Sequence, residues 1–148
     1  MLNEYKAHVD ERAAQNIPPL PLDADQTAQL ADLLKSEHEE SELLLHLLKE
    51  RVPAGVDQSA YVKAAFLADI TTGKASSPYI TKSDAVHILG TMLGGYNIQP
   101  LIECLKIDEL GDEAAEALGR TLLIFDAFNE IFELSKTNQY AKKVIDAW

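Results

Sequence analysis

Helical periodicity is the feature of this sequence that most restricts its fold. Apolar residues recur at the spacing of one helix face along almost the whole chain, and strand-like alternation over more than four residues is hard to find. Short breaks of proline, glycine or polar residues interrupt the pattern, and the sharpest has three prolines in four positions at 18–21. The sequence therefore predicts an all-α protein.

The pattern predicts about seven to eight antiparallel helices joined by short loops. The first three are expected at 2–14, at 24–34, and from 36 or 37 to 51. The fourth is expected between an N-cap at Asp57 or Ser59 and a C-cap at Gly73. The others are expected at 82–92, 98–105, 112–135 and 139–148. The 112–135 segment is either continuous or bent near Gly119. Two residues are predicted N-caps: Asp23, which Gln26 follows three residues later, and Thr81. Helix pairs repeat at roughly forty residues, a spacing in the range of HEAT and armadillo solenoids. Because no clean sequence repeat accompanies it, an α-solenoid and a helix bundle are both left open.

The same spacing predicts which side chains of two helices are buried. For the fourth helix the expected apolar face is Tyr61, Val62, Ala65, Phe66 and Ile70. For the 112–135 segment it is Leu118, Leu122, Phe125, Phe128, Ile131, Phe132 and Leu134.

Length and charge restrict the kind of protein. A chain of 148 residues suits one domain, 1–148. Its net charge of -11 repels phosphate backbones and anionic headgroups, so we expect no direct nucleic-acid contact and no membrane contact. No apolar stretch approaches the ~20 residues that span a bilayer, and no signal-like segment follows Met1. We therefore expect a cytoplasmic protein.

A possible metal site is the set His38, Glu42 and His46. On one helix these residues share a face, and two histidines with a carboxylate can ligate zinc. The two histidines would lie about 12 Å apart along the axis, too far to reach one ion easily. We expect a solvated acidic face here, with a small metalloenzyme as an alternative that metal analysis tests.

Two further motifs favour structural roles. Cys104, the only cysteine, rules out an intramolecular disulfide or a four-thiolate cluster within one chain, and nothing in the sequence directs the nearest histidine, His87, toward it. Gly90, Gly94 and Gly95 lack the preceding strand and the following Lys-Ser or Lys-Thr of a phosphate loop. We expect a buried cysteine, a close helix contact at Gly90, and a tight turn at Gly94 and Gly95.

The remaining candidate is an acidic group formed by Glu109, Asp112, Glu113 and Glu116. Paired carboxylates perform acid–base chemistry when they are buried together. These carboxylates lie in a polar turn and a first helical turn, where we expect them to be solvated. On these grounds we assign no catalytic, cofactor-binding or metal-binding residue.

Several stretches of the chain resemble one known family. They are ERAA at 11–14, PLDA at 21–24, RVPAGVD at 51–57, VKAAFLA at 62–68, Ser77-Pro78, GTMLGGYNIQPLI at 90–102, TLLIFD at 121–126 and YAK at 140–142. In this order and over essentially the whole chain, they resemble the N-terminal domain of the bacterial aconitase B family.

The resemblance implies a HEAT-like α-solenoid that forms the first segment of a larger enzyme. That enzyme interconverts citrate and isocitrate through cis-aconitate in the tricarboxylic acid cycle, with a [4Fe-4S] cluster as Lewis acid. No catalytic or cluster-binding residue of the family falls in this stretch, so we expect no cofactor here. The end at Trp148, without a cap or polar tail, also leads us to expect a segment of a longer chain.

The partners that the resemblance implies are the catalytic domains of the parent enzyme and a second copy of the chain. Family members are also described as binding their own messenger RNA, for which the charge of -11 makes this segment a poor direct contact. We expect a protein-interaction surface that also shapes the substrate tunnel, with contributions from Gly94, Gly95 and Tyr96 and from the aromatic-rich 112–135 segment. The alternative is a stand-alone helical adaptor with no enzymatic parent.

Overall fold

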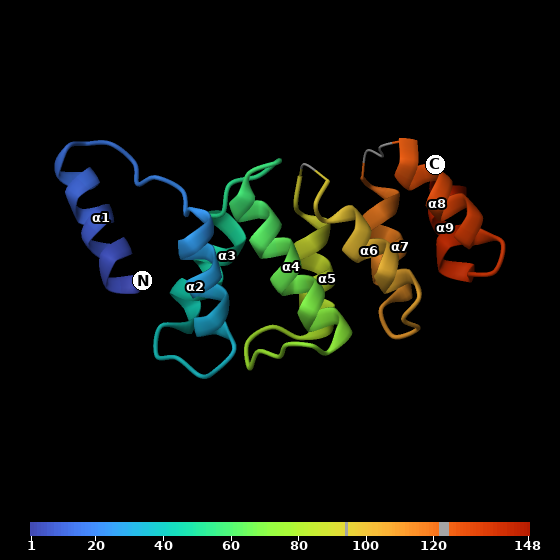
Figure 1. The fold of residues 1–148 in the computed structure, drawn as a ribbon, viewed down its shortest axis with the longest axis horizontal. Coiled ribbons are helices and arrows are strands. Elements are labelled where there is room, and N and C mark those ends of the chain that lie inside the picture. The colour runs from blue at the N-terminus through green and yellow to red at the C-terminus, as the bar shows by residue number, and fades with distance from the viewer. Residues whose placement is uncertain (94, 122–124) are drawn as a thin grey trace.

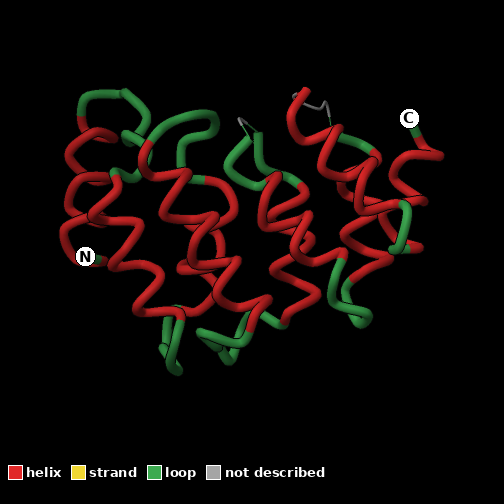
Figure 2. The backbone as a smooth tube through the Cα atoms, turned by 45° about the vertical axis from the view of Figure 1, so that its right-hand side comes forward, coloured by secondary structure: helices red, strands yellow, loops and turns green. Residues whose placement is uncertain are grey.

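The computed structural model describes residues 1–93, 95–121 and 125–148. Within these residues the chain forms nine α-helices and no strand (Figure 2). The helices are α1 Leu2–Ala14, α2 Ala24–Leu34, α3 Ser41–Glu50, α4 Gln58–Thr72, α5 Lys82–Gly90, α6 Ile98–Leu105, α7 Gly111–Gly119, α8 Phe125–Ser135 and α9 Gln139–Ala147. The all-α prediction is confirmed, and the described chain has more helices than the seven or eight expected.

The helices follow one another along a row, from α1 at one end to α8 and α9 at the other (Figure 1). The principal contacts connect helices that are close in sequence: α2 packs on α3 and α4, α4 on α5, and α5 on α7. At the far end α7 packs on α6 and α9, and α8 packs on α9. The order of the helices in space therefore follows their order in the sequence.

Helix ends with a strong local signal lie where the sequence predicts them. At α2, the backbone N–H of Gln26 donates to Asp23 Oδ1 at 2.7 Å and the N–H of Asp23 donates to Gln26 Oε1 at 3.0 Å. Thr81 and Asp84 form the same reciprocal pair at α5. The chain leaves α4 through Gly73, whose φ of 82° is a conformation that glycine adopts without strain.

Three boundaries differ from prediction. The helix expected from 36 or 37 begins at Ser41, because the N–H of His38 donates to the Tyr79 hydroxyl and the N–H of Glu40 donates to His38 Nδ1. The helix expected at 82–92 ends at Gly90. The 112–135 segment forms two helices, α7 and α8, and the predicted bend near Gly119 coincides with the end of α7.

Leucines dominate the core between the helices. The largest fully buried side chains are Leu22, Leu30, Leu34, Leu44, Leu47, Leu48, Leu67, Leu89, Leu101, Ile102, Leu105 and Leu118. At the α5–α7 contact, a Cβ added to Gly90 would lie 3.0 Å from Ala117 Cβ. The close helix contact predicted at Gly90 is therefore present.

The predicted buried faces are wrong in part. On α4, Val62 is half-buried, Phe66 and Ile70 are buried, but Tyr61 and Ala65 are exposed while Lys63 is buried. Because α4 packs on α2, α5 and α6, its buried face is rotated from the one that periodicity suggests. On α8, Ile131 is buried but Phe128 and Phe132 are 39% and 44% exposed. The side chains of Leu122 and Phe125 lie outside the described residues.

Candidate functional site

An apolar groove lies between α4 and α6. We call it the α4–α6 groove. Its volume is about 440 Å³, and its floor consists of small α4 side chains, Ala64, Ala65 and Ala68. The rim consists of Tyr61, Thr71, Thr72, Gly95, Tyr96, Gln99, Pro100 and Glu103. Small residues on one helix therefore leave a depression that the aromatic rings border.

The turn before α6 holds one wall of the α4–α6 groove in place. Gly95 has a φ of 102°, which a side chain would strain. Tyr96 meets Tyr61 edge-on, with ring centroids 5.5 Å apart and an interplanar angle of 77°, and its hydroxyl donates to the Val56 carbonyl at 3.3 Å. The Asn97 amide, buried, donates to the carbonyls of Leu89 at 2.7 Å and Met92 at 3.2 Å. These bonds connect the turn to the end of α5.

The second exposed surface is an aromatic cluster on α8 and α9. Phe128 stacks on Phe132 with ring centroids 6.2 Å apart, and on Trp148 with centroids 5.6 Å apart. All three rings remain more than a third exposed. Because three stacked, exposed aromatic rings form a continuous apolar patch, this cluster has the composition of a contact surface.

The structure separates the residues of the predicted zinc set. His38 precedes α3 and its Nδ1 accepts the N–H of Glu40, so the three residues do not share one helix face. Within the described residues, no group of three or more histidine, cysteine, aspartate or glutamate side chains is placed to hold a metal ion. The i, i+4, i+8 arrangement assumed from the sequence is wrong because α3 begins at Ser41.

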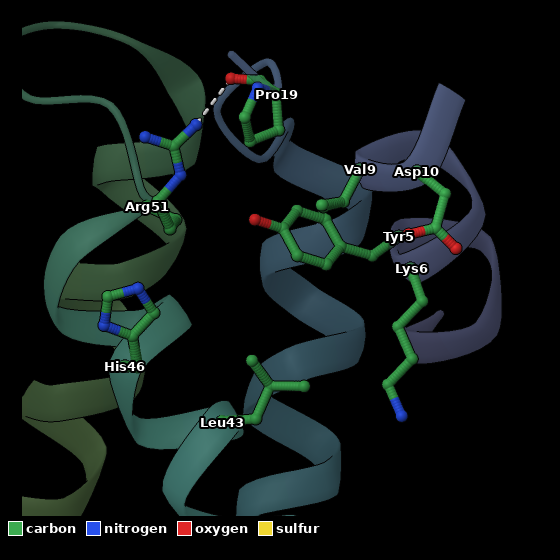
Figure 3. Close-up of a pocket in the computed structure, with 8 residues that line it drawn as sticks. All are labelled: Tyr5, Lys6, Val9, Asp10, Pro19, Leu43, His46 and Arg51. Carbon is green, nitrogen blue, oxygen red and sulfur yellow. Dashed lines mark hydrogen bonds between the residues drawn. The ribbon is translucent and has the colours of Figure 1, made fainter. Parts of the chain in front are cut away.

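His46 instead lines a pocket of about 390 Å³ between α1 and α3 (Figure 3). Tyr5 reaches across from α1 toward Arg51, which donates to the Pro19 carbonyl at 2.6 Å. Lys6 also lines this pocket. Asp10 lines it as well, and Lys6 pairs with Glu40, so the walls of this pocket carry both signs of charge.

Cys104 is fully buried, and burial raises the pKa of its thiol. The nearest histidine in sequence does not face it: His87 Nε2 lies 3.9 Å from Glu113 Oε2. A thiol with a raised pKa and no access to solvent is a poor nucleophile. The structure thus favours the packing role predicted for Cys104.

The four acidic residues do not form a carboxylate pair. Asp112 pairs with Lys143 of α9, and Glu116 Oε1 lies 3.8 Å from Arg120 Nη1. Glu113 accepts a 2.8 Å hydrogen bond from the Ser83 hydroxyl, and Glu109 is exposed. Of the two glycines in the predicted tight turn, Gly95 has a positive φ and Gly94 lies outside the described residues.

Lys63 is the notable residue that sequence reasoning missed. Its side chain is only 5% exposed, and burial lowers its pKa to about 8, against the opposing effect of the Glu50 carboxylate. A spacing signal was present, since Lys63 follows Ala60 by three residues and precedes Leu67 by four. A lysine is so rarely buried that periodicity arguments pass over it.

Fold and surfaces together place the chain among all-α domains that expose apolar surfaces. Residues 4–148 match the Aconitate B N-terminal domain, and the chain belongs to this family. The family resemblance inferred from the sequence motifs is confirmed.

Individual relatives agree. The chain is 54% identical to aconitate hydratase B of Synechocystis sp. (strain PCC 6803) and 54% identical to aconitate hydratase B of Escherichia coli (strain K12), with all of this chain aligned in both cases. It is 42% identical to aconitate hydratase B of Helicobacter pylori (strain J99), over 99% of its length. The aligned region is 17%, 17% and 18% of the respective relatives, so the chain spans less than a fifth of their length. No helix within the described residues is long and apolar enough to cross a bilayer.

Proposed function

We propose that this chain is a non-catalytic helical domain of an aconitate hydratase B and acts through protein–protein contacts. The observation that carries the proposal is 54% identity to such enzymes along the whole chain. The parent reaction is the interconversion of citrate and isocitrate through cis-aconitate, by a hydro-lyase in the cytoplasm.

The residues of this chain do not fit the [4Fe-4S] cluster that the family implies. Iron–sulfur clusters are held by several cysteine thiolates. Cys104 is the only cysteine in the sequence, and it is buried with a raised pKa. The cluster and the catalytic residues therefore belong, in this proposal, to other parts of the parent enzyme.

The proposed architecture is a HEAT-like α-solenoid, a single domain over 1–148. Its support is the row of helices, in which packing partners are close in sequence (Figure 1). Such a row presents long faces rather than one enclosed pocket. The α4–α6 groove and the aromatic cluster lie on those faces.

We assign these two surfaces to contacts with the catalytic domains, where they also shape the substrate tunnel, or with a second copy of the chain. Exposed aromatic side chains favour such contacts, since they bury large areas at low entropic cost. The net charge of -11 opposes direct contact with nucleic acid or an anionic membrane.

An exchange experiment tests this function. In the Escherichia coli enzyme, the matching N-terminal segment is replaced by this chain, and cis-aconitate hydration and sedimentation are measured. We expect an active, assembled hybrid, and no hydration by the 148-residue chain alone. Turnover by the isolated chain would refute the non-catalytic assignment, and an unassembled hybrid would refute the docking role.

Single substitutions in the hybrid locate the contact. Tyr61→Asp in the groove and Phe132→Asp in the aromatic cluster are expected to weaken assembly or concentration-dependent association at least tenfold. The matched control is Ala7→Asp, which adds the same charge at an exposed position of α1. If all three variants assemble like the unsubstituted hybrid, neither surface is the interface.

A further inference from the structure

A lysine pair in a small pocket is independent of the proposed scaffold function. Lys63 of α4 extends its 5%-exposed side chain into a pocket of about 110 Å³. Lys49, an exposed residue near the end of α3, lines the same pocket. The other lining residues are the polar Thr91 and five with apolar side chains: Val52, Pro53, Ala54, Met92 and Leu93.

Burial of the Lys63 ammonium is not balanced by a close carboxylate. Among the described residues, no ion pair or hydrogen bond reaches its Nζ, and Glu50 is the one group that favours its charged form. Desolvation of an ammonium without a close partner raises the neutral fraction of Lys63 above that of an ordinary lysine.

The neutral amine is the nucleophilic form. With a pKa of about 8 instead of 10.5, about a quarter of Lys63 is neutral at pH 7.5, against roughly 0.1% of an ordinary lysine. Lower basicity also weakens each neutral amine as a nucleophile, which offsets part of this gain. A net advantage of roughly tenfold remains.

We propose that Lys63 is an acylation site, at which its ε-amine takes a small acyl group, of acetyl size, from an activated donor that is a thioester or an acyl phosphate. The pocket accommodates a few heavy atoms beside the amine. Its apolar walls suit a neutral amide better than the ammonium that the amide replaces.

The reaction balances without any further reagent. The lone pair of the neutral amine forms a bond to the acyl carbon, and the bond from that carbon to the sulfur or phosphate oxygen breaks. The leaving group departs as a thiolate or phosphate anion. The proton lost from the amine nitrogen passes to water or to the leaving group, and the product is a neutral amide.

Lys49 accounts for the choice of donor. Coenzyme A thioesters and acyl phosphates both carry anionic phosphate groups, and Lys49 presents an exposed ammonium at the pocket that holds Lys63. Local attraction raises the concentration of an anionic donor at this point of a chain whose net charge is otherwise -11. Lys49 is therefore a positioning residue for the donor.

Site-resolved mass spectrometry of the folded 148-residue chain tests the proposal. The chain is incubated separately with acetyl coenzyme A and with acetyl phosphate at pH 7.5, and acetylation of each lysine is followed in time. We expect Lys63 to react about tenfold faster than Lys74, an exposed lysine. Faster reaction of Lys63 with at least one of the two donors supports the proposal, and comparison of the two incubations shows which donors the site accepts. Lys63 reacting no faster than Lys74 with either donor overturns it.

The dependence on pH and folding distinguishes this site from a merely buried lysine. Labelling of Lys63 by a neutral acetyl ester should level off above pH 8, whereas labelling of Lys74 should continue to rise. In strong urea the two lysines should react alike. Labelling of Lys63 that occurs only in urea overturns the proposal, because it would come from the unfolded chain.

A Lys49→Gln variant tests the positioning role. Acetylation of Lys63 by the two anionic donors should fall severalfold, while acetylation by the neutral ester should stay within twofold. Circular dichroism checks that the variant is folded. An equal fall for anionic and neutral donors contradicts donor guidance by Lys49.

Discussion

Single residues decide how closely the helices of this protein approach one another. Gly90 lets α5 meet Ala117 of α7, and Gly111 lets α7 meet the ring of Tyr140 on α9. A Cβ built on Gly111 would lie 2.3–2.5 Å from three atoms of that ring. The Tyr140 hydroxyl donates to the Asp108 carbonyl at 3.3 Å, so the ring is fixed at both ends. Glycine at 111 is therefore required by space, since its backbone is ordinary helix.

The clash at Gly111 outweighs helix propensity. Gly111→Ala should lower the free energy of unfolding by about 1–2 kcal/mol, although alanine by itself favours a helix by about 0.5–1 kcal/mol. Urea denaturation measures the change. In a Tyr140→Ala background the same substitution should be neutral or stabilising, because the ring is gone. A loss of equal size in both backgrounds would place the cause elsewhere.

Lys63 gives the stability of the protein a specific pH dependence. Its folded-state pKa of about 8 lies below 10.5, so between these values the unfolded chain binds more protons and stability rises with pH. Below about pH 8 Lys63 is protonated in both states, so the folded protein bears the full free-energy cost of desolvating the ammonium. Lys63→Met should therefore raise the free energy of unfolding by about 1–2 kcal/mol at pH 7, and the gain should disappear toward pH 10.5.

Chemical denaturation of both proteins from pH 7 to 10.5 measures this difference. The matched control is Lys74→Met, at an exposed position, which should run parallel to the unsubstituted protein. If the free energy of unfolding of Lys63→Met stayed parallel to that of the unsubstituted protein over the whole pH range, Lys63 would titrate alike in the folded and unfolded states.

At the scale of elements, helix ends divide into those fixed locally and those fixed by neighbours. Asp23 with Gln26, Thr81 with Asp84, and Gly73 act within a few residues of their own helix, and the sequence predicts all three ends. The start of α3 was predicted too early, because it depends on the bond from the His38 N–H to Tyr79, 41 residues further along the chain. A contact between residues so far apart in sequence produces no periodic pattern from which the helix end could be predicted.

The end of α5 is a second such case, and it leads to a prediction. Asn97 is 1% exposed and satisfies the carbonyls of both Leu89 and Met92. Asn97→Ala should lower the free energy of unfolding by about 1–2 kcal/mol, since the Met92 carbonyl loses its Asn97 donor and the buried Leu89 carbonyl keeps only backbone donors such as the Met92 N–H. The exposed neighbour Gln99→Ala should cost under about 0.5 kcal/mol by the same thermal or urea measurement. If both substitutions lowered the free energy of unfolding equally, Asn97 would not be a residue that stabilises the wall of the α4–α6 groove.

For the molecule as a whole, a row of helices makes stability uneven along its length. Helix α1 lies at one end (Figure 1), and only Leu2 and Tyr5 among its residues are buried. Its remaining attachments include the ion pair of Lys6 with Glu40 and the bond from the Leu20 N–H to His8 Nε2 at 2.9 Å. The 390 Å³ pocket beside α3 further reduces its packing.

Amide hydrogen exchange should reveal this gradient. We expect amides of α1 to exchange at least about tenfold faster than those of α4 and α7, because local opening of α1 exposes little apolar surface. The matched control is α9, which lies at the other end but packs on α7 and α8 through Ala141 and Val144. If the amides of α1 were as well protected as those of α4, the gradient would be contradicted. If the amides of α9 exchanged as fast as those of α1, the fast exchange would be a property of both ends of the row and not of the weak packing of α1.

The sequence by itself determined the helical class, most helix positions and the family. These depend on signals of short range: apolar spacing, caps such as Asp23 and Thr81, and a glycine-tyrosine motif read along the chain. The proposed absence of catalytic residues follows from the same sequence and remains a prediction.

Only the tertiary structure decided which side of each helix is buried. The burial of Lys63, the exposure of Tyr61 and Phe132, and the dispersal of the His38, Glu42 and His46 set depend on which helices pack against one another. Periodicity shows that a helix has an apolar side, but a helix in a row has neighbours on two sides and solvent on the others. The orientation of each helix about its axis depends on many contacts between residues that are distant in sequence, and these contacts form only when the helices pack together.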